Sequence, residues 1–297
     1  QISLPLSGTG IRGVRFLLEL DANKVKSLYF NDHSDKATSL IKKNIKKNKL
    51  STKHISISTK DANLFLMDSK GFDYIDIDPF GTPNPFLDSA IRRLSRNSIL
   101  AVTATDTSAL CGSYPKACLR KYWALHKTNP IMHELGLRIL IRKAQLVAAQ
   151  YDKALTPIFS YSKDHYMRVF FNCEKSKKSV NKILKKHDFF NNYGPLWVGQ
   201  LWDKRLAANI AKSSKENHNL HQFLSIIAQE SKLSTVGFFN IHKIVKENKL
   251  KKIPKKEILF QKIKSKKYTA SLTHFNPISI RSNIPLEELI KLIRSLK

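Results

Sequence analysis

The residues best suited to chemistry in this chain form the short stretch Asp78-Pro-Phe-Gly. An alternating apolar run over residues 72–77 leads into it and predicts a strand that enters a sheet core. We expect the strand to stop here, because proline cannot continue a sheet ladder and glycine permits a sharp turn. A carboxylate, a backbone carbonyl and an aromatic ring would then stand at a strand's carboxyl end, where open α/β sheets place their chemistry. This arrangement suits holding a flat base that bears an exocyclic amine.

A glycine-rich loop near the start of the chain is the second chemical feature. Gly8, Gly10 and Gly13 follow a short apolar stretch at residues 4–6 and precede an apolar helix pattern at residues 14–20. Glycines let a ligand approach the backbone, and the helix N-terminus behind them favours negative groups. No Gly-Lys-Ser/Thr follows, which excludes a Walker-type phosphate loop. The pattern alone leaves open a dinucleotide site, an S-adenosylmethionine site, or a tight turn with packing glycines.

Two acidic residues end the next two predicted strands. Asp32 ends a strand over residues 25–32, where a carboxylate can accept hydrogen bonds from both hydroxyls of a ribose. Asp61 and Ala62 follow the strand within residues 54–66. There the carboxylate can accept from an adenine amino group while a backbone N–H donates to the ring. Asp61 could equally cap a helix, and its position alone does not decide between the two roles.

Strands and helices alternate through the first half of the chain. After the strand at 72–77, the pattern predicts a helix at 84–94, a buried strand at 98–105 and mostly helix over 116–150. Two more strands are predicted at 155–161 and 166–172. Alternation at this spacing indicates a parallel sheet with helices on both faces, closed by an antiparallel hairpin.

The composition favours a nucleic-acid partner. The chain of 297 residues has 52 Lys and Arg against 23 Asp and Glu, a net charge of +29. Such a charge favours a polyanion, although compositional drift and a membrane surface are the competing explanations. No run of 18 apolar residues exists, so a membrane span is not expected. Three cysteines suit a reducing cytosol rather than a disulfide framework.

The character of the chain changes near residue 176, and we predict one domain over 1–176 and a second over 177–297. The second part holds 25 Lys and Arg against 8 Asp and Glu. Amphipathic helix patterns occur near 202–212, 219–231, 240–248 and 285–295. Short basic helices with Lys-rich segments between them are typical of a winged-helix-like or other small α+β nucleic-acid module.

Several motifs, taken in order, resemble the archaeal-type tRNA (guanine-26 N2)-dimethyltransferase family. The resemblance covers essentially the whole chain and implies a class I, Rossmann-like α/β fold that uses S-adenosyl-L-methionine. It also implies a smaller basic α+β C-terminal domain that helps to hold tRNA. The matching segments are Ser7–Arg15, Asn31-Asp32, Asp61–Asn63, Asp76–Pro83, Thr103–Thr107, Pro115–Tyr122, Ser160–Arg168, Gly194–Trp197 and Thr273–Pro277.

The resemblance implies roles for particular residues. It makes Arg12, Asp32, Asp61 and Ala62 cofactor-binding positions, to which the glycine loop adds Gly8 and Gly10. It makes Asp78, Pro79 and Phe80 the catalytic edge.

The chemistry of these residue types agrees with that edge. Guanine N2 is a poor nucleophile because its lone pair is delocalised into the ring. The Asp78 carboxylate and the backbone carbonyl at Asp78–Pro79 can accept its two hydrogens, while Phe80 stacks on the base. Most of the catalysis is then positioning, after the base has been flipped out of the RNA. Asp76, two residues further into the strand, is interpreted as a polar residue at the edge of the core.

The chain departs from the family pattern at three places. Leu4 stands where the family normally has Asp, so one contact to the methionine part of the cofactor is expected to be missing. The chain begins with Gln1 in a motif already under way, and we expect the family's upstream segment to precede it. Only Cys173 remains where many archaeal members have two Cys-x-x-Cys pairs, so we predict no zinc. Cys111 and Cys118 are predicted to be structural.

The sequence therefore predicts a cytoplasmic, monomeric enzyme that methylates guanine N2 in tRNA, with guanine 26 as the expected position. It is expected to need no metal and no membrane. Two alternatives stay open. One is a DNA amino-methyltransferase, whose Asp/Asn-Pro-Pro-Tyr/Phe motif serves the same chemistry. The other is a basic RNA-binding protein that has lost catalysis.

Overall fold

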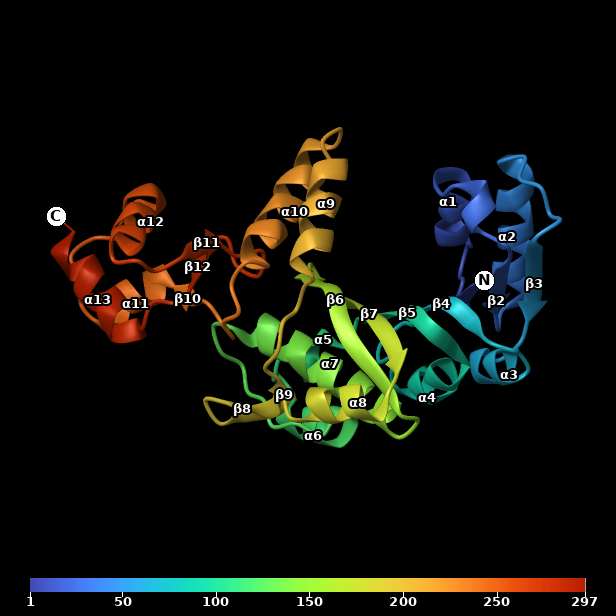
Figure 1. The fold of residues 1–297 in the computed structure, drawn as a ribbon, viewed down its shortest axis with the longest axis horizontal. Coiled ribbons are helices and arrows are strands. Elements are labelled where there is room, and N and C mark those ends of the chain that lie inside the picture. The colour runs from blue at the N-terminus through green and yellow to red at the C-terminus, as the bar shows by residue number, and fades with distance from the viewer. Residues whose placement is uncertain (297) are drawn as a thin grey trace.

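The computed structural model describes residues 1–296 as an elongated molecule built around one large sheet (Figure 1). Its seven strands lie in the order β3-β2-β1-β4-β5-β7-β6. β1 to β5 are parallel, whereas β7 runs antiparallel to both β5 and β6. The predicted parallel sheet closed by an antiparallel hairpin is confirmed. The strands are β1 (Ile2–Leu4), β2 (Leu28–Asp32), β3 (Ile55–Thr59), β4 (Phe72–Ile77), β5 (Leu94–Ala104), β6 (Lys153–Lys163) and β7 (Tyr166–Lys175).

Helices cover both faces of this sheet, and the side chains of β4 show which helix covers which face. Ile75 and Ile77 are fully buried in one core with Leu87 of α4. Tyr74 instead makes an edge-to-face contact with Phe16 of α1, with ring centroids 5.6 Å apart. Successive side chains of a strand point to opposite faces, so α1 and α4 lie on opposite sides of the sheet. The helices of this part are α1 (Ile11–Glu19), α2 (Asp35–Lys47), α3 (Ala62–Met67), α4 (Asn84–Arg93), α5 (Thr107–Leu110), α6 (Pro115–Tyr122) and α7 (Met132–Ala149).

The elements that follow residue 176 pack first against the sheet. They are α8 (Lys177–Leu184), the hairpin of β8 (His187–Phe190) and β9 (Tyr193–Trp197), α9 (Lys204–Ser213) and α10 (His218–Glu230). Val180, Trp197 and Ile227 from these elements belong to the same core as the sheet, as does Trp202 between β9 and α9. The division of the chain after residue 176 stays a prediction. Within residues 1–296, no helix is both long and apolar enough to cross a membrane.

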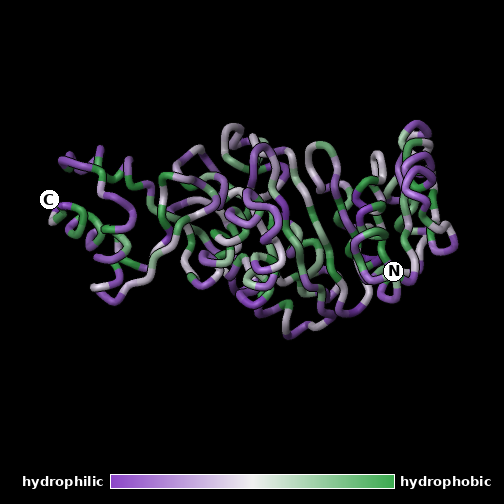
Figure 2. Tube along the Cα trace, turned by 90° about the horizontal axis from the view of Figure 1, so that it is seen from above, coloured by the Kyte–Doolittle hydropathy of each residue, from purple (hydrophilic) through white to green (hydrophobic). Residues whose placement is uncertain are grey.

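A separate C-terminal module, residues 239–296, stands at the end of the molecule opposite the N-terminal strands (Figures 1 and 2). Its three-stranded antiparallel sheet has the order β10-β12-β11 and carries its own core around Leu259, Ile280 and Leu289. A small α+β unit is thus present at the C-terminal end, and it is shorter than the domain predicted over residues 177–297. Its elements are β10 (Phe239–Asn240), α11 (Ile241–Glu247), α12 (Lys256–Ser265), β11 (Ala270–Leu272), β12 (Ser279–Ser282) and α13 (Leu286–Ser295).

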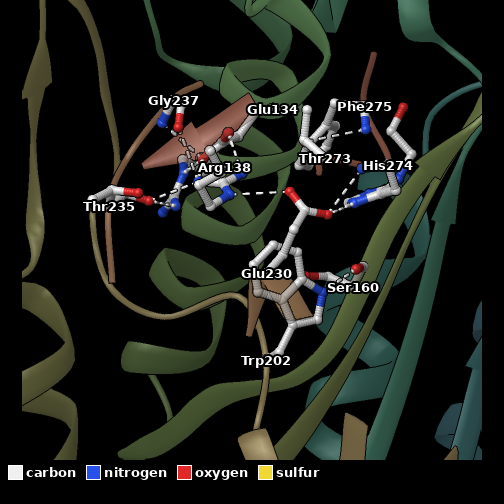
Figure 3. A network of polar contacts seen from close by, with 12 residues as sticks. Glu134, Arg138, Ser160, Trp202, Glu230, Thr235, Gly237, Thr273, His274 and Phe275 are labelled. Carbon is white, nitrogen blue, oxygen red and sulfur yellow. Dashed lines mark hydrogen bonds and ion pairs between the residues drawn. The ribbon is translucent and has the colours of Figure 1, made fainter. Parts of the chain in front are cut away.

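A buried network of charges joins this module to the rest of the molecule. Arg281 of β12 is fully buried and pairs with Glu134 of α7 at 2.6 Å and with Glu230 of α10 at 3.0 Å. Arg138, one turn after Glu134, pairs with the same carboxylate at 2.9 Å. His274 approaches the second oxygen of Glu230 at 2.5 Å (Figure 3). Each buried charge has an opposite partner, which offsets the cost of its desolvation.

This network predicts how stability depends on pH. Burial alone would raise the pKa of Glu230, but His274 and Arg281 outweigh it and lower that pKa to about 2. As the pH falls, the unfolded state therefore takes up the proton first. The stabilisation by Glu230 is complete above about pH 4.5 and is lost toward pH 2.

We expect Glu230→Gln to lower the free energy of unfolding at pH 7 by about 3–5 kcal/mol, because it leaves Arg281 short of a buried partner. It should also flatten the acid loss of stability between pH 4.5 and 2. Urea unfolding at a series of pH values measures both effects. The control is Glu247→Gln, which breaks the exposed pair with Lys243 and should cost less than about 1 kcal/mol. Equal losses in the two variants would contradict the role of the buried network.

Candidate active site at the carboxyl edge of the sheet

The strand order reverses between β1 and β4, and the predicted functional residues gather at this point. β1 leads to β2 on one side, whereas β4 leads to β5 on the other. In open α/β sheets, ligands bind in the crevice that such a reversal leaves at the carboxyl ends of the strands. The glycine loop, residues 7–10, follows β1, and residues 78–81 follow β4. The topology thus brings to one crevice two motifs that lie far apart in the sequence.

The two glycines of the loop differ in what surrounds them. Gly10 is the N-cap of α1 with a φ of +73°, and a Cβ there would lie 2.8 Å from the side chain of Ile41. Gly8 has a φ of +54°, and a Cβ there would meet no atom within 4 Å. Packing against α2 therefore requires glycine at position 10, whereas position 8 borders open space in which a ligand can approach the backbone.

Asp32 and Asn31, at the end of β2, hold the neighbouring loops in place. Asp32 is buried, and its Oδ2 accepts a hydrogen bond from the Gly8 amide at 2.8 Å. The side-chain amide of Asn31 donates to the backbone carbonyls of Pro5 and Lys60 at 3.0 and 2.9 Å. The loops that follow β1, β2 and β3 are thereby tied together. Ribose binding by Asp32 stays a prediction, and Asn31 has no predicted role beyond its place in the motif.

Asp61 and Ala62 lie at the start of α3, at the same edge of the sheet. Oδ1 of Asp61 accepts hydrogen bonds from the amides of Asn63 and Leu64 at 2.9 and 3.1 Å. The helix-cap interpretation of Asp61 is therefore confirmed. The cap uses only one carboxylate oxygen of this exposed residue. Cofactor binding by Asp61 and by the buried Ala62 stays a prediction.

The turn after β4 holds an exposed ring on a tethered loop. The Gly81 amide donates to Thr105 Oγ1 at 2.6 Å, and the Thr105 amide donates back to the Gly81 carbonyl at 2.9 Å. Pro79 is buried, whereas the relative exposure of Phe80 is 103%. Holding a large apolar side chain in water is unfavourable for folding, since it forgoes the free energy of burial. Phe80 thus presents an apolar ring to solvent at the carboxyl end of β4.

Arg12 connects the predicted catalytic carboxylate with the interior of the sheet. Its Nη2 lies 2.7 Å from Asp78 Oδ2, and its Nη1 donates to Asp76 Oδ1 at 3.1 Å. The side chains of Arg12 and Asp78 are about one-third exposed, whereas that of Asp76 is buried. Ser7 and Ile11 join these three residues in lining a cavity of about 100 Å³. The predicted cofactor-binding Arg12 thus directly contacts the predicted catalytic Asp78.

Asp76 is the centre of a buried cluster that sequence reasoning only partly anticipates. Arg168 of β7 pairs with both Asp76 oxygens, at 2.7 and 3.1 Å, and donates to Thr103 Oγ1 at 2.5 Å. The Tyr74 hydroxyl donates to Asp76 Oδ2 at 2.9 Å. Asp76 lies at the edge of the core, where the sequence analysis places it. The sequence does offer one signal for Arg168, since an arginine within an apolar strand predicts a buried acidic partner. Buried arginines are almost always paired.

The cluster also determines which groups carry charge. Burial opposes the charge of the Arg168 guanidinium, but Asp76 outweighs it and raises the pKa of Arg168. Burial and then Asp76 raise the pKa of the Tyr74 hydroxyl. Arg168 therefore stays cationic and Tyr74 stays a neutral donor at physiological pH. Two arginines face two aspartates in this cluster, so its charges balance.

The cysteines lie apart from this chemistry. Cys111, Cys118 and Cys173 are buried and form no disulfide. Burial raises the pKa of Cys111 to about 12 and that of Cys118 to about 11, which disfavours a nucleophilic thiolate. This agrees with a structural role for both residues. In the part of the chain that the structure describes, no group of three or more His, Cys, Asp or Glu residues could hold a metal ion.

Comparison with known proteins gives matches over nearly the whole chain. The model of a family described as N2,N2-dimethylguanosine tRNA methyltransferase matches residues 1–192 and 185–294. The tRNA (guanine(26)-N(2)/guanine(27)-N(2))-dimethyltransferase of Aquifex aeolicus is 36% identical over 331 residues, covering 100% of this chain and 83% of that protein. The tRNA (guanine(26)-N(2))-dimethyltransferase of Methanocaldococcus jannaschii is 35% identical over 311 residues, covering 97% and 82%.

A solved structure has the same fold. It is that of Trm1 from Pyrococcus horikoshii in complex with S-adenosyl-L-methionine, which superposes with a TM-score of 0.91 at 33% sequence identity. The match covers 98% of this chain and 88% of that one. The two chains therefore share one fold over nearly the whole of this chain. This agrees with the Rossmann-like α/β fold class that the sequence resemblance implies.

The Asp76 cluster leads to a prediction about stability. Arg168→Met removes the pair to both Asp76 oxygens and leaves a buried carboxylate with only Arg12 beside it. We expect the free energy of unfolding to fall by about 3–5 kcal/mol, as for other broken buried pairs. Arg168→Lys keeps a charge but loses the two-pronged contact, so it should cost less.

Thermal and urea unfolding measure these differences. The matched control is Arg15→Met on α1, which breaks the solvent-exposed pair with Glu19 and should be much less destabilising. If Arg168→Met is no more destabilising than Arg15→Met, Asp76 does not depend on Arg168.

Proposed function

This chain belongs to the N2,N2-dimethylguanosine tRNA methyltransferase family, and we propose that it transfers methyl groups from S-adenosyl-L-methionine to the exocyclic N2 amine of a guanine in tRNA. The family predicted from the sequence is thereby confirmed. We propose guanine 26 as the position, in line with the names of both relatives. The observation that carries the proposal is the cavity at which Arg12 and Asp78 meet, two residues before the exposed Phe80.

The residues at the carboxyl edge fit S-adenosyl-L-methionine. The space beside Gly8 leaves room for a ligand against the backbone. Asp32, Asp61 and Arg12 offer charged groups to the polar parts of the cofactor. When bound, the cofactor supplies an electrophilic methyl group. We propose that Asp32 holds the ribose hydroxyls, that Asp61 and Ala62 hold the adenine, and that Arg12 pairs with the carboxylate of the methionine part. Gly8 and Gly10 shape the loop between them.

Asp78, Pro79 and Phe80 are the proposed contacts of the guanine. The Asp78 carboxylate accepts a hydrogen from the exocyclic N2 and takes up the proton that the nitrogen loses. The backbone carbonyl at Asp78–Pro79 accepts the other hydrogen, which orients the nitrogen lone pair. The exposed ring of Phe80 provides a stacking surface for a base that has left its helix. Catalysis by this edge is therefore mainly orientation of a weak nucleophile.

The charge of the chain supports an RNA substrate. Its net charge of +29 favours a phosphate backbone, and the basic C-terminal module adds a second surface for tRNA. We further propose that the protein works as a monomer in the cytoplasm and needs no metal ion. Sedimentation of the purified protein measures the oligomeric state.

The proposed role of Asp78 is tested by methyl transfer from labelled S-adenosyl-L-methionine to unmodified tRNA. We expect Asp78→Asn to lower kcat by about 10²-fold or more, because the amide accepts hydrogens poorly and cannot take up a proton. The control is Asp68→Asn, which changes an exposed, lysine-paired aspartate at the far end of α3 and should leave kcat unchanged. Equal methyl incorporation by Asp78→Asn and wild type would contradict the assignment.

Two further measurements separate the alternatives. Incorporation into DNA but not into tRNA would favour the DNA amino-methyltransferase. Calorimetry with S-adenosylhomocysteine separates the enzyme from a basic RNA-binding protein, because a protein that only binds RNA should show no heat of binding.

A further inference from the structure

The outer face of α6 combines positive charge with apolar side chains. Lys116, Leu119, Arg120 and Trp123 recur at the helical spacing that places residues on one side, and all four are exposed. The opposite side of the helix is buried through Cys118 and Tyr122. We call the four exposed residues the α6 face. No Asp or Glu occurs in the surrounding residues 107–130, so nothing within this segment neutralises its charge.

Trp123 is held in an unusual position at the end of this face. It is the C-cap of α6 with a φ of +57°, in the left-handed region that a bulky side chain rarely adopts. Its side chain is 47% exposed, whereas Trp197 and Trp202 are each 3% exposed. The Lys143 ammonium lies 3.0 Å from the centre of its ring. Trp123 thus has a strained backbone and a buried lysine against its ring, yet its indole stays at the surface. This combination suggests that the indole serves a ligand rather than the fold.

Hydrogen bonds connect α6, the helix that carries the α6 face, to the candidate active site. The Tyr122 hydroxyl donates to Thr82 Oγ1 at 2.9 Å, and the Asn84 side chain donates to the Lys121 carbonyl at 2.8 Å. Both partners lie just after the turn that carries Phe80. Lys121 also pairs with Asp106, which follows β5, at 2.8 Å. Direct hydrogen bonds therefore join α6 to the segment that follows Phe80.

We propose that the α6 face binds the RNA strand next to the target guanine, with Trp123 stacking on an unpaired base and with Lys116 and Arg120 contacting phosphates. The proposal rests on the proposed function, since it assigns a surface to the RNA substrate. Aromatic rings interleaved with basic side chains are the recurrent chemistry of single-stranded RNA binding, because every base has a face that can stack. The Lys143 cation lies against the indole, and the exposed part of the ring is available to a base.

Fluorescence tests this directly, because Trp123 is the most exposed tryptophan of the chain. We expect tRNA to quench the emission of the wild type and to protect it from acrylamide, and both effects should vanish in Trp123→Phe. Trp123→Gly should weaken tRNA binding roughly 5- to 150-fold. Glycine suits the left-handed backbone at this position, so this variant should stay folded. Trp123→Phe retains a stacking ring and should bind within about threefold of the wild type, as judged from the sequence tolerance of stacking.

The two basic residues are tested by the salt dependence of tRNA binding. Lys116→Ala with Arg120→Ala should reduce the slope of log Kd against log salt by about 2, since two phosphate contacts are lost. The matched control is Lys42→Ala with Lys46→Ala on α2, which removes two exposed charges at the same helical spacing. This control should leave the slope unchanged.

The outcomes separate this proposal from the proposed function. If the wild type does not methylate tRNA, the proposed function fails. If it does, but Trp123→Gly binds tRNA as tightly as the wild type and the emission is not quenched, the α6 face is not an RNA surface. Equal slopes for the α6 and α2 pairs would also overturn it. Quenching by anionic phospholipid vesicles but not by tRNA would assign the face to a membrane surface instead.

Discussion

The buried carboxylate of Asp76 is the group on which the candidate site depends. Left unpaired in the sheet, it would be strongly destabilising, so the fold must bring cations to it. Arg12 comes from the helix after β1, and Arg168 comes from β7. The strand order places β4 between these two sources, and both arginines converge on one carboxylate. Arg12, once held there, directs its other nitrogen to Asp78. The position of the candidate catalytic residue thus follows from the need to pair a charge two residues away.

The same physical constraint holds the C-terminal module. Arg281 of β12 reaches carboxylates on α7 and α10, so the module is connected to the body by charges that have no access to water. Buried ion pairs add little net stability compared with well-packed apolar residues, but the protein is strongly destabilised when one partner is removed. Such a contact therefore specifies a geometry more than it strengthens the fold.

Local patterns predict the sheet well and its long-range contacts poorly. Alternation and turn residues lie within a few positions of each other, and β4, α4 and the β6–β7 hairpin are found where these patterns place them. The helices α8 and α12 lie in lysine-rich segments and are not among the predicted elements. The sequence also does not predict the pairing of Arg168 with Asp76 or of Arg281 with Glu134, which join residues 92 and 147 positions apart. Partner choice over such distances depends on strand order and packing, which no local pattern contains.

Asp76 and Asp78 lie on the same side of the strand but at different depths, and their surroundings therefore differ. A strand period of two directs both side chains to the α1 face, where both meet Arg12. The deeper carboxylate is 1% exposed and has two arginines and a tyrosine as partners, so it cannot exchange them readily. The outer carboxylate is 31% exposed and has one arginine that is itself partly in water. Only the outer carboxylate can accept a new hydrogen-bond donor at small cost. The inner one holds Arg12 beside the outer one.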